Sequence, residues 1–282
     1  MENVRVIGAL KRVHCLVLFT LLLGFASLVQ AKSCFDDITY VEPEKQMTKR
    51  ALYILIDETV PLSKVMKKKI SNLLSGWGKQ GDKVKIARFS ASYRGLYPEL
   101  VYDERVEQLP DEQYMFNLRY KDKKGVVQCL DEQRMQFKEN FAKQLKASLN
   151  TINPGIPKSE LMGSLKLLSK QLILKDEAQE KVVLLISDGL ENSALTSFYS
   201  NGKLKNIKPK SEISKLRRKG MMGYWKNTKV YMYGLGLLPD KKQYINPERI
   251  TSLKRFWGRY FVEGGGRIKE IGTPELLLTA ID

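Results

Sequence analysis

Residues 51–63 read Ala-Leu-Tyr-Ile-Leu-Ile-Asp-Glu-Thr-Val-Pro-Leu-Ser, and this stretch decides the fold. Its first six residues are apolar without alternation, which is typical of a strand buried on both faces in the middle of a parallel sheet. The apolar run stops at Asp57, and the hydroxyl of Thr59 follows two residues later. Open α/β sheets place their ligands at the carboxyl ends of such strands, so the stretch predicts a polar site beside a central strand.

An amphipathic helix is predicted directly after this strand. Apolar residues recur at helical spacing from Leu62 to Trp77, and Lys67, Lys68 and Lys69 fill the opposite face. Strand and helix patterns then alternate along the chain. Further strands are predicted at 83–90, 181–189, 229–236 and 267–271, and helices at 137–145, 161–172, within the basic segment 203–229, at 247–260 and from Pro274. This alternation predicts an α/β fold with a doubly wound, mostly parallel sheet. Residues 96–101 predict one antiparallel edge strand, where Pro98 is tolerated.

The N-terminus has the pattern of a secretory signal peptide. Three basic residues within 1–12 precede an almost wholly apolar run from 13 to 29, and Val29-Gln30-Ala31 offers small residues at a cleavage point. We therefore predict a signal peptide at 1–31 and a periplasmic or otherwise extracytoplasmic location. An uncleaved signal anchor is the alternative, because a run of about 17 apolar residues is just long enough to span a bilayer.

Removal of residues 1–31 changes the composition in two ways. The remaining 251 residues carry a formal charge of +15, because the segment holds three basic residues and one acidic residue. The segment also holds His14, the only histidine of the chain. A Ser-His-Asp triad, a Cys-His dyad and a His-ligated zinc site are therefore excluded for the processed chain.

Two cysteines follow the signal segment, Cys34 and Cys129. An even count in an oxidising compartment predicts a disulfide, and two unpaired thiols are the alternative. The bond would join an N-terminal extension at 32–50 to an acid-rich insertion at about 103–135. Alternating apolar residues from Tyr114 to Tyr120 predict a short strand inside this insertion.

Several of these features together resemble a von Willebrand factor A-like domain of the bacterial exported type. The features are Asp57-x-Thr59 after the first strand, Ser159 at the start of a helix, Ile186-Ser187-Asp188-Gly189 after another strand, and Tyr233-Gly234-Leu235-Gly236. The order of elements agrees over residues 51–282. The resemblance implies a single α/β domain over this range, with a metal-ion-dependent adhesion site formed by three loops at the crest of the sheet.

Carried onto this sequence residue by residue, the family pattern implies a degenerate metal site. The implied ligands are Asp57, Thr59, Ser159 and Asp188, with Ser159 standing where the family has threonine, and Ser63 and Glu191 as accessory candidates. Pro61 occupies the place of the second serine and has no side-chain oxygen to offer. The implied ion is Mg²⁺, with Mn²⁺ or Ca²⁺ as substitutes, because these hard cations prefer oxygen ligands.

The same residues also fit structural roles. The two aspartates can cap the helices that follow their strands, and Ser159 can be the N-cap of the third helix. Glu58 and Glu191 fit solvent-facing positions as well as ligating ones.

Three functions are compatible with these patterns. The first, which we favour, is a non-enzymatic exported module of an envelope-associated assembly that binds another protein through an acidic side chain of the partner. The second is a metal-dependent phosphohydrolase of the haloacid-dehalogenase-like type, because Asp57-Glu58-Thr59-Val60 resembles the opening motif of that family. The third is a binder of nucleic acid or another polyanion, motivated by the charge of +15 but disfavoured because no aromatic-interleaved recognition motif is visible. Adhesion to an anionic envelope surface is a milder consequence of the same charge.

Overall fold

The computed structural model describes residues 33–36, 38, 48–90, 98–153, 160–194, 196–200, 203–238 and 246–281. The chain divides into a short N-terminal unit, Met1–Asp36, and a main unit, Asp37–Asp282. In the first unit, residues 33–36 form a turn in which the Asp36 N–H donates to the Ser33 carbonyl. The predicted signal segment lies outside the described residues. Within the described part of the chain, no helix is long and apolar enough to cross a membrane.

The main unit alternates strands and helices, as predicted. Its strands are β1 (Arg50–Asp57), β2 (Asp82–Phe89), β3 (Glu99–Arg105), β4 (Glu180–Ile186), β5 (Tyr199–Ser200), β6 (Lys203–Leu204), β7 (Thr228–Tyr233) and β8 (Arg267–Ile271). Its helices are α2 (Lys64–Leu73), α3 (Glu112–Asn117), α4 (Tyr120–Asn150), α5 (Leu161–Leu168), the π-helix η1 (Ser169–Ile173), α6 (Pro209–Arg218) and α7 (Pro247–Glu263).

Six strands form one sheet in the order β3-β2-β1-β4-β7-β8. All neighbours pair in parallel except β2 and β3, so β3 is the predicted antiparallel edge strand. The fold class predicted from the sequence is therefore confirmed. The strand order reverses between β1 and β4, and such a switch point is where an open α/β sheet forms a crevice at the carboxyl ends of its strands.

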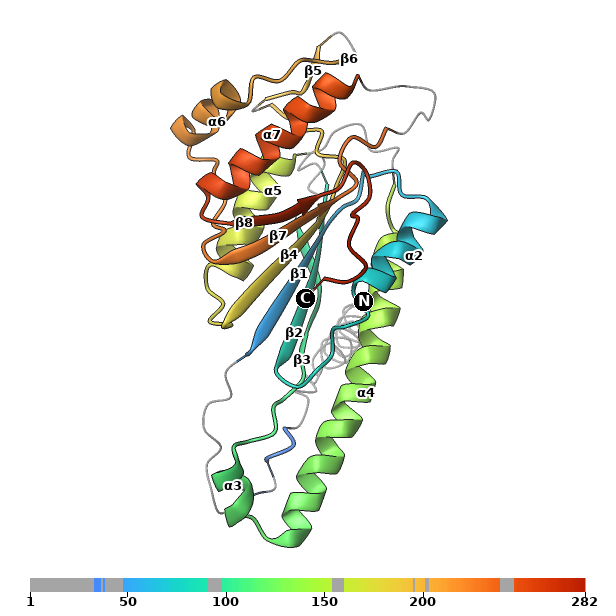
Figure 1. Cartoon of the computed structure of the whole chain (residues 1–282), viewed down its shortest axis with the longest axis vertical. Coiled ribbons are helices and arrows are strands. Elements are labelled where there is room, and N and C mark those ends of the chain that lie inside the picture. The colour runs from blue at the N-terminus through green and yellow to red at the C-terminus, as the bar shows by residue number, and fades with distance from the viewer. Residues whose placement is uncertain are drawn as a thin grey trace, which may run out of the picture. The chain divides into compact units, whose positions relative to one another are not determined.

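Helices cover both faces of the sheet (Figure 1). Side chains of β1 pack against the helices on both faces of the sheet, because successive residues of a strand point to opposite faces. Leu52, Ile54 and Ile56 pack with α2 and α4, whereas Ala51, Tyr53 and Leu55 pack in the cluster that includes α5 and α7. β1 is buried from Ala51 to Asp57, so the central strand is apolar on both faces, as its sequence predicts.

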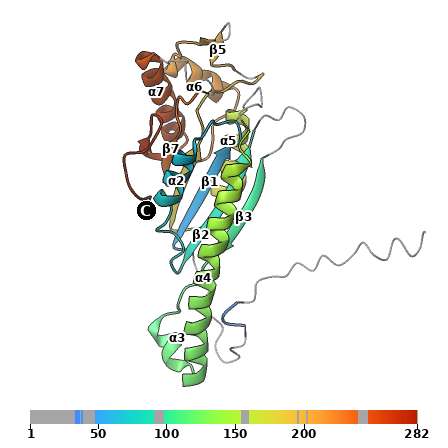
Figure 2. The same ribbon diagram turned by 90° about the vertical axis from the view of Figure 1, so that its right-hand side faces the viewer.

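The acid-rich insertion departs from the predicted strand. Residues 114–117 form the end of α3, Leu118 and Arg119 connect the two helices in extended conformation, and α4 begins at Tyr120. Tyr114 and Leu118 are buried, while Phe116 and Tyr120 are exposed. Tyr114 is the buried residue of α3, and Leu118 is buried in the extended connection that follows this helix. The Asp111 carboxylate caps α3 by accepting the Tyr114 N–H at 2.7 Å. The first half of α4 extends past the amino ends of the strands together with α3 (Figures 1 and 2).

The C-terminal segment is the second departure. A helix was expected from Pro274, but residues 272–281 contain no helix. The segment instead lies along α2, where the Ile281 N–H donates to the Leu73 carbonyl and the Trp77 indole N–H donates to the Ile281 carbonyl at 3.0 Å. Tertiary hydrogen bonds of this kind replace those that a helix would have provided.

The predicted cysteine pairing is confirmed. Cys34 and Cys129 are joined in a disulfide. Such a bond fits an oxidising compartment.

Candidate functional site

Two aspartates meet at the crest of the sheet, at the switch point between β1 and β4. Asp57 is the last residue of β1, and Asp188 follows β4 by two residues. The Ser187 hydroxyl joins the two strand ends, because it donates to Asp57 Oδ2 at 2.8 Å and accepts the Gly189 N–H at 3.0 Å. Thr59 donates both its hydroxyl (2.6 Å) and its backbone N–H (2.9 Å) to Asp57 Oδ1. We call Asp57, Thr59, Ser187 and Asp188 the crest cluster.

Asp188 is held in an unfavourable environment for a carboxylate. Burial raises its pKa well above the usual value, and the neighbouring charge of Asp57 raises it further. The Leu190 N–H, which donates to Asp188 Oδ1 at 2.9 Å, acts in the opposite direction. Among the described residues, Asp188 forms no ion pair, and its Oδ2 atom has no hydrogen-bond partner. One oxygen of Asp188 is therefore available to an external group.

The loop that carries Asp188 is shaped by Gly189. This residue has a φ of +73°, in the left-handed region that glycine tolerates best. A Cβ here would lie 2.5 Å from a Leu235 side-chain atom and 2.6 Å from the Trp257 indole nitrogen. The indole N–H also donates to the Gly189 carbonyl at 3.0 Å. Trp257 of α7 therefore fixes the loop that places Asp188 beside Asp57.

Glu191 has a structural partner. Its Oε2 atom accepts the Met162 N–H at 3.0 Å, so the carboxylate caps the start of α5, where a negative charge is favourable. Burial raises the pKa of Glu191 to about 7, against the hydrogen bonds from Ser193 and Met162. The side chain is fully buried, so the solvent-facing alternative for Glu191 does not hold.

Ser63 and Pro61 lie in the segment that connects β1 to α2. Ser63 is exposed and is the N-cap of α2, where its Oγ accepts the Met66 N–H at 3.2 Å. Pro61 is half-buried and offers no side-chain oxygen. Ser159, the fourth predicted ligand, lies outside the described residues. The structure thus brings together Asp57, Thr59 and Asp188.

Two residues near the crest were not predicted as site residues. Ser187 holds Asp57 in place, and only the adjacent Asp188-Gly189 in the sequence pointed to it. Tyr199 is half-buried in β5, and its pKa is raised to about 12 by burial and by the charges of Asp188 and Asp57. Its segment returns to the crest because the Phe198 N–H donates to the Glu191 carbonyl at 2.9 Å. No local pattern in the sequence signals this return.

The donor set of the crest cluster consists of oxygen atoms only. Carboxylates and hydroxyls are the ligands that Mg²⁺ and Ca²⁺ prefer, so the chemistry of the cluster fits a hard cation. The Thr59 hydroxyl donates its proton to Asp57 and keeps lone pairs that can face a cation. The cluster holds two carboxylates, and the described ranges contain no group of three or more His, Cys, Asp or Glu side chains that could hold a metal ion.

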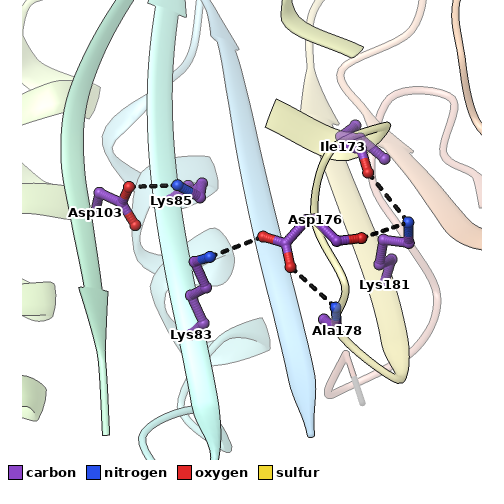
Figure 3. A network of polar contacts seen from close by, with 7 residues as sticks. All are labelled: Lys83, Lys85, Asp103, Ile173, Asp176, Ala178 and Lys181. Atoms are coloured by element: carbon purple, nitrogen blue, oxygen red, sulfur yellow. Dashed lines mark hydrogen bonds and ion pairs between the residues drawn. The ribbon is translucent and has the colours of Figure 1, made fainter. Parts of the chain in front are cut away.

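A second polar cluster lies on the sheet near the amino ends of β1 and β4 (Figure 3). Its centre is Asp176, which accepts from Lys83 Nζ at 2.9 Å and from the Ala178 N–H at 3.0 Å. Lys181 donates to the Asp176 carbonyl, and Lys85 pairs with Asp103 on β3. Burial alone would raise the pKa of Asp176, but its hydrogen bonds, above all the one from Lys83, lower it overall. We call Asp176, Lys83 and their partners the Asp176 cluster.

Comparisons with known proteins yield a likeness of fold. No protein-family model matches the chain, and no curated protein does. Similar solved structures include proximal thread matrix protein 1 from the mussel byssus (13% identity over 74% of this chain and 39% of that chain, TM-score 0.34) and the SpRpn10 VWA domain (10% identity over 82% and 91%, TM-score 0.37). A third is BatB from Bacteroides thetaiotaomicron (11% identity over 80% and 91%, TM-score 0.35).

The chain spans less than half the length of the mussel protein. A second structure of that protein carries zinc in its MIDAS motif (13% identity over 78% of this chain and 47% of that chain, TM-score 0.33). The TM-scores of these structures are all below 0.5, and the fold class of this chain rests on its own strand order and pairing.

Proposed function

We propose that this chain is an exported, non-enzymatic protein-binding module that engages its partner through the crest cluster with the help of a bound divalent cation. One observation carries the proposal. Asp188 is a nearly buried carboxylate with a raised pKa, next to a second carboxylate, and its Oδ2 atom has no partner among the described residues. Such an arrangement costs stability unless an external group compensates it, and strongly perturbed carboxylates in a crevice are typical of functional sites.

The residues of the crest divide into ligands and supports. Asp57, Thr59 and Asp188 would hold the cation, while Ser187 orients Asp57 through the 2.8 Å hydrogen bond. When bound, the cation would neutralise the two carboxylates and offer an open coordination position to an oxygen ligand. A carboxylate of a partner protein is the chemistry that fits this position. With Pro61 in place of a hydroxyl residue, water would supply a further ligand and the affinity would be lower.

The crest lacks one group that the haloacid-dehalogenase-like alternative would need, because Thr59 stands where that family has its second aspartate, the general acid. The hydroxyls of Thr59 and Ser187 donate their protons to Asp57, so they support its carboxylate. These contacts favour recognition over catalysis.

The test is thermal unfolding of the exported chain with Mg²⁺ or Mn²⁺ and with EDTA. A ligand that binds only the native state stabilises it by about 2.7 kcal/mol at 100 times its Kd. We expect Mg²⁺ to raise the melting temperature of the wild type and of Glu139→Gln, a control at an exposed position of α4. Asp188→Asn should lose the response, because it keeps the Leu190 contact but removes the charge that binds the ion.

Partner binding is tested with the same three proteins. Solubilised envelope proteins that the wild type and Glu139→Gln retain in Mg²⁺ should be released by EDTA and not retained by Asp188→Asn. Retention of the same proteins by Asp188→Asn in EDTA would contradict binding through the crest. Absence of any thermal response to either ion would contradict the role of the metal.

A further inference from the structure

The outer face of α4 carries exposed apolar side chains. Tyr120 is 84% exposed, Val127 45% and Met135 61%. The opposite side of the same stretch is the buried one, with Val126, Leu130 and Phe137. The first half of α4 extends past the strands (Figure 2), so the sheet does not cover this outer face. Apolar residues at spacings of seven and eight on one exposed face are typical of a helix that packs against another helix.

Eight residues of this face line a hollow of about 620 Å³. They are Tyr120, Lys123, Lys124, Val127, Gln128, Asp131, Glu132 and Met135. Their order is self-complementary about the point between Val127 and Gln128. The outermost pair is apolar, and the two pairs inside it each combine a lysine with an acid. The innermost pair, Val127 and Gln128, flanks the centre itself.

We propose that this face of α4 binds the same face of a second copy of the chain, with the two helices antiparallel about a two-fold axis between Val127 and Gln128. In that arrangement Lys124 faces Asp131 of the other copy, and Lys123 faces its Glu132. Tyr120 packs against Met135 of the other copy. The two-fold symmetry makes each of these contacts twice, as in any isologous interface.

The charge pattern selects this partner and this direction. A parallel pairing of two copies would set Lys124 beside Lys124 and Asp131 beside Asp131, which is repulsive. Antiparallel pairing sets each of these lysines beside an acidic residue of the other copy, which is attractive. The contacts that Asp131 and Glu132 make within α4 are exposed ones, with Arg134 at 3.4 Å and with Gln128 at 2.9 Å. Both acids therefore remain accessible to lysines of a second copy.

The interface is small, so the dimer should be weak. From Tyr120 to Met135 the helix is about 22 Å long at 1.5 Å per residue. A single helix face of this length is below the size of a standard stable interface. The dimer does not involve the crest cluster, so its test is independent of the proposed function.

The test is a charge-swap cycle measured by sedimentation equilibrium on the exported chain. Lys124→Glu sets glutamate against Asp131 at both symmetric positions, and Asp131→Lys sets lysine against Lys124. Each change turns two attractions into repulsions, so each should weaken dimerisation roughly tenfold. The double variant Lys124→Glu/Asp131→Lys should restore wild-type affinity. Seven residues apart, these two side chains do not pair within one helix, so the restoration reports contact between copies.

Zero-length cross-linking gives the second readout. A carbodiimide should join Lys124 to Asp131, and mixed ¹⁵N-labelled and unlabelled chains should show that this link is intermolecular. The two residues lie about 10 Å apart along one helix, too far for such a bond within it. A chain that stays monomeric at the highest soluble concentration would overturn the proposal. A dimer that the single variants do not weaken, or that the double variant does not restore, would also overturn it.

Discussion

The crest cluster and the Asp176 cluster place buried carboxylates in opposite surroundings. Asp176 accepts from a lysine and from a backbone N–H, and these contacts lower its pKa despite burial. Asp188 accepts one backbone N–H and faces a second carboxylate, and its pKa is raised. Both sites lie on the same sheet, one near the amino ends and one at the carboxyl ends of the central strands. The first carboxylate is paired with a lysine within the chain, whereas the second accepts a single backbone N–H and forms no ion pair among the described residues.

The difference separates a structural polar cluster from a candidate binding site. A carboxylate that is paired with a lysine, as Asp176 is, stabilises the folded state, and its removal should lower the free energy of unfolding. A carboxylate kept close to another one, as Asp188 is, lowers stability in the absence of a ligand, which is a common property of functional sites. The same type of substitution should therefore have opposite effects at the two places, and three experiments address this contrast.

The largest expected effect is the pH dependence that Glu191 adds beside the crest. Its pKa is raised to about 7 in the folded state, so between pH 4.5 and 7 the folded chain binds a proton that the unfolded chain has released. Stability should therefore fall as pH rises through this range, by about 3 kcal/mol at most. Glu191→Gln keeps the acceptor for Met162 and should flatten this decline in urea unfolding measured from pH 4.5 to 8. An unchanged slope would show that Glu191 is ionised throughout.

Next in size is the loss of the central charge of the Asp176 cluster. Asp176→Asn leaves the partly buried ammonium of Lys83 without its counter-charge and should destabilise the fold by about 2 kcal/mol at pH 7. Because the pKa of Asp176 is lowered, its contribution is present above about pH 4 and is lost as pH falls through the folded-state pKa. Urea unfolding at pH 7 and at pH 3 checks both statements. Asp103→Asn is the comparison variant, because the Asp103 carboxylate that pairs with Lys85 is more exposed and should matter less.

The smallest effect has the opposite sign. Asp188→Asn in EDTA should stabilise the chain by about 1 kcal/mol at pH 8, because it removes the repulsion with Asp57 and keeps an acceptor for the Leu190 N–H. The measurement is chemical unfolding without metal, beside Glu139→Gln. Destabilisation by Asp188→Asn would mean that its charge is compensated within the chain, and the contrast between the two clusters would then disappear.

The sequence by itself determined the central elements of the fold. The apolar runs ending at Asp57 and Ile186 are buried on both faces, and burial on both faces leaves a direct mark on composition. The positions of Asp57, Thr59 and Asp188 followed from the same runs, because the carboxyl ends of neighbouring parallel strands lie at one edge of the sheet. The antiparallel edge strand was also predictable, although β3 begins at Glu99, three residues later than expected.

Only the tertiary structure decided which polar residues act together. Ser187 belongs to the crest through its hydrogen bond to Asp57, and only the neighbouring Asp188-Gly189 pointed to it. Tyr199 lies near the crest on a returning loop, and no local pattern signals this position. Glu191 caps the start of α5 by accepting the Met162 N–H. Met162 is 29 residues away in the sequence, so local spacing does not reveal this contact. Residues 114–117 are part of α3, although their spacing in the sequence also fitted a strand. The chain after Pro274 forms a hydrogen bond with α2 and no helix of its own. Long-range contacts decided each of these cases, and sequence spacing does not encode them.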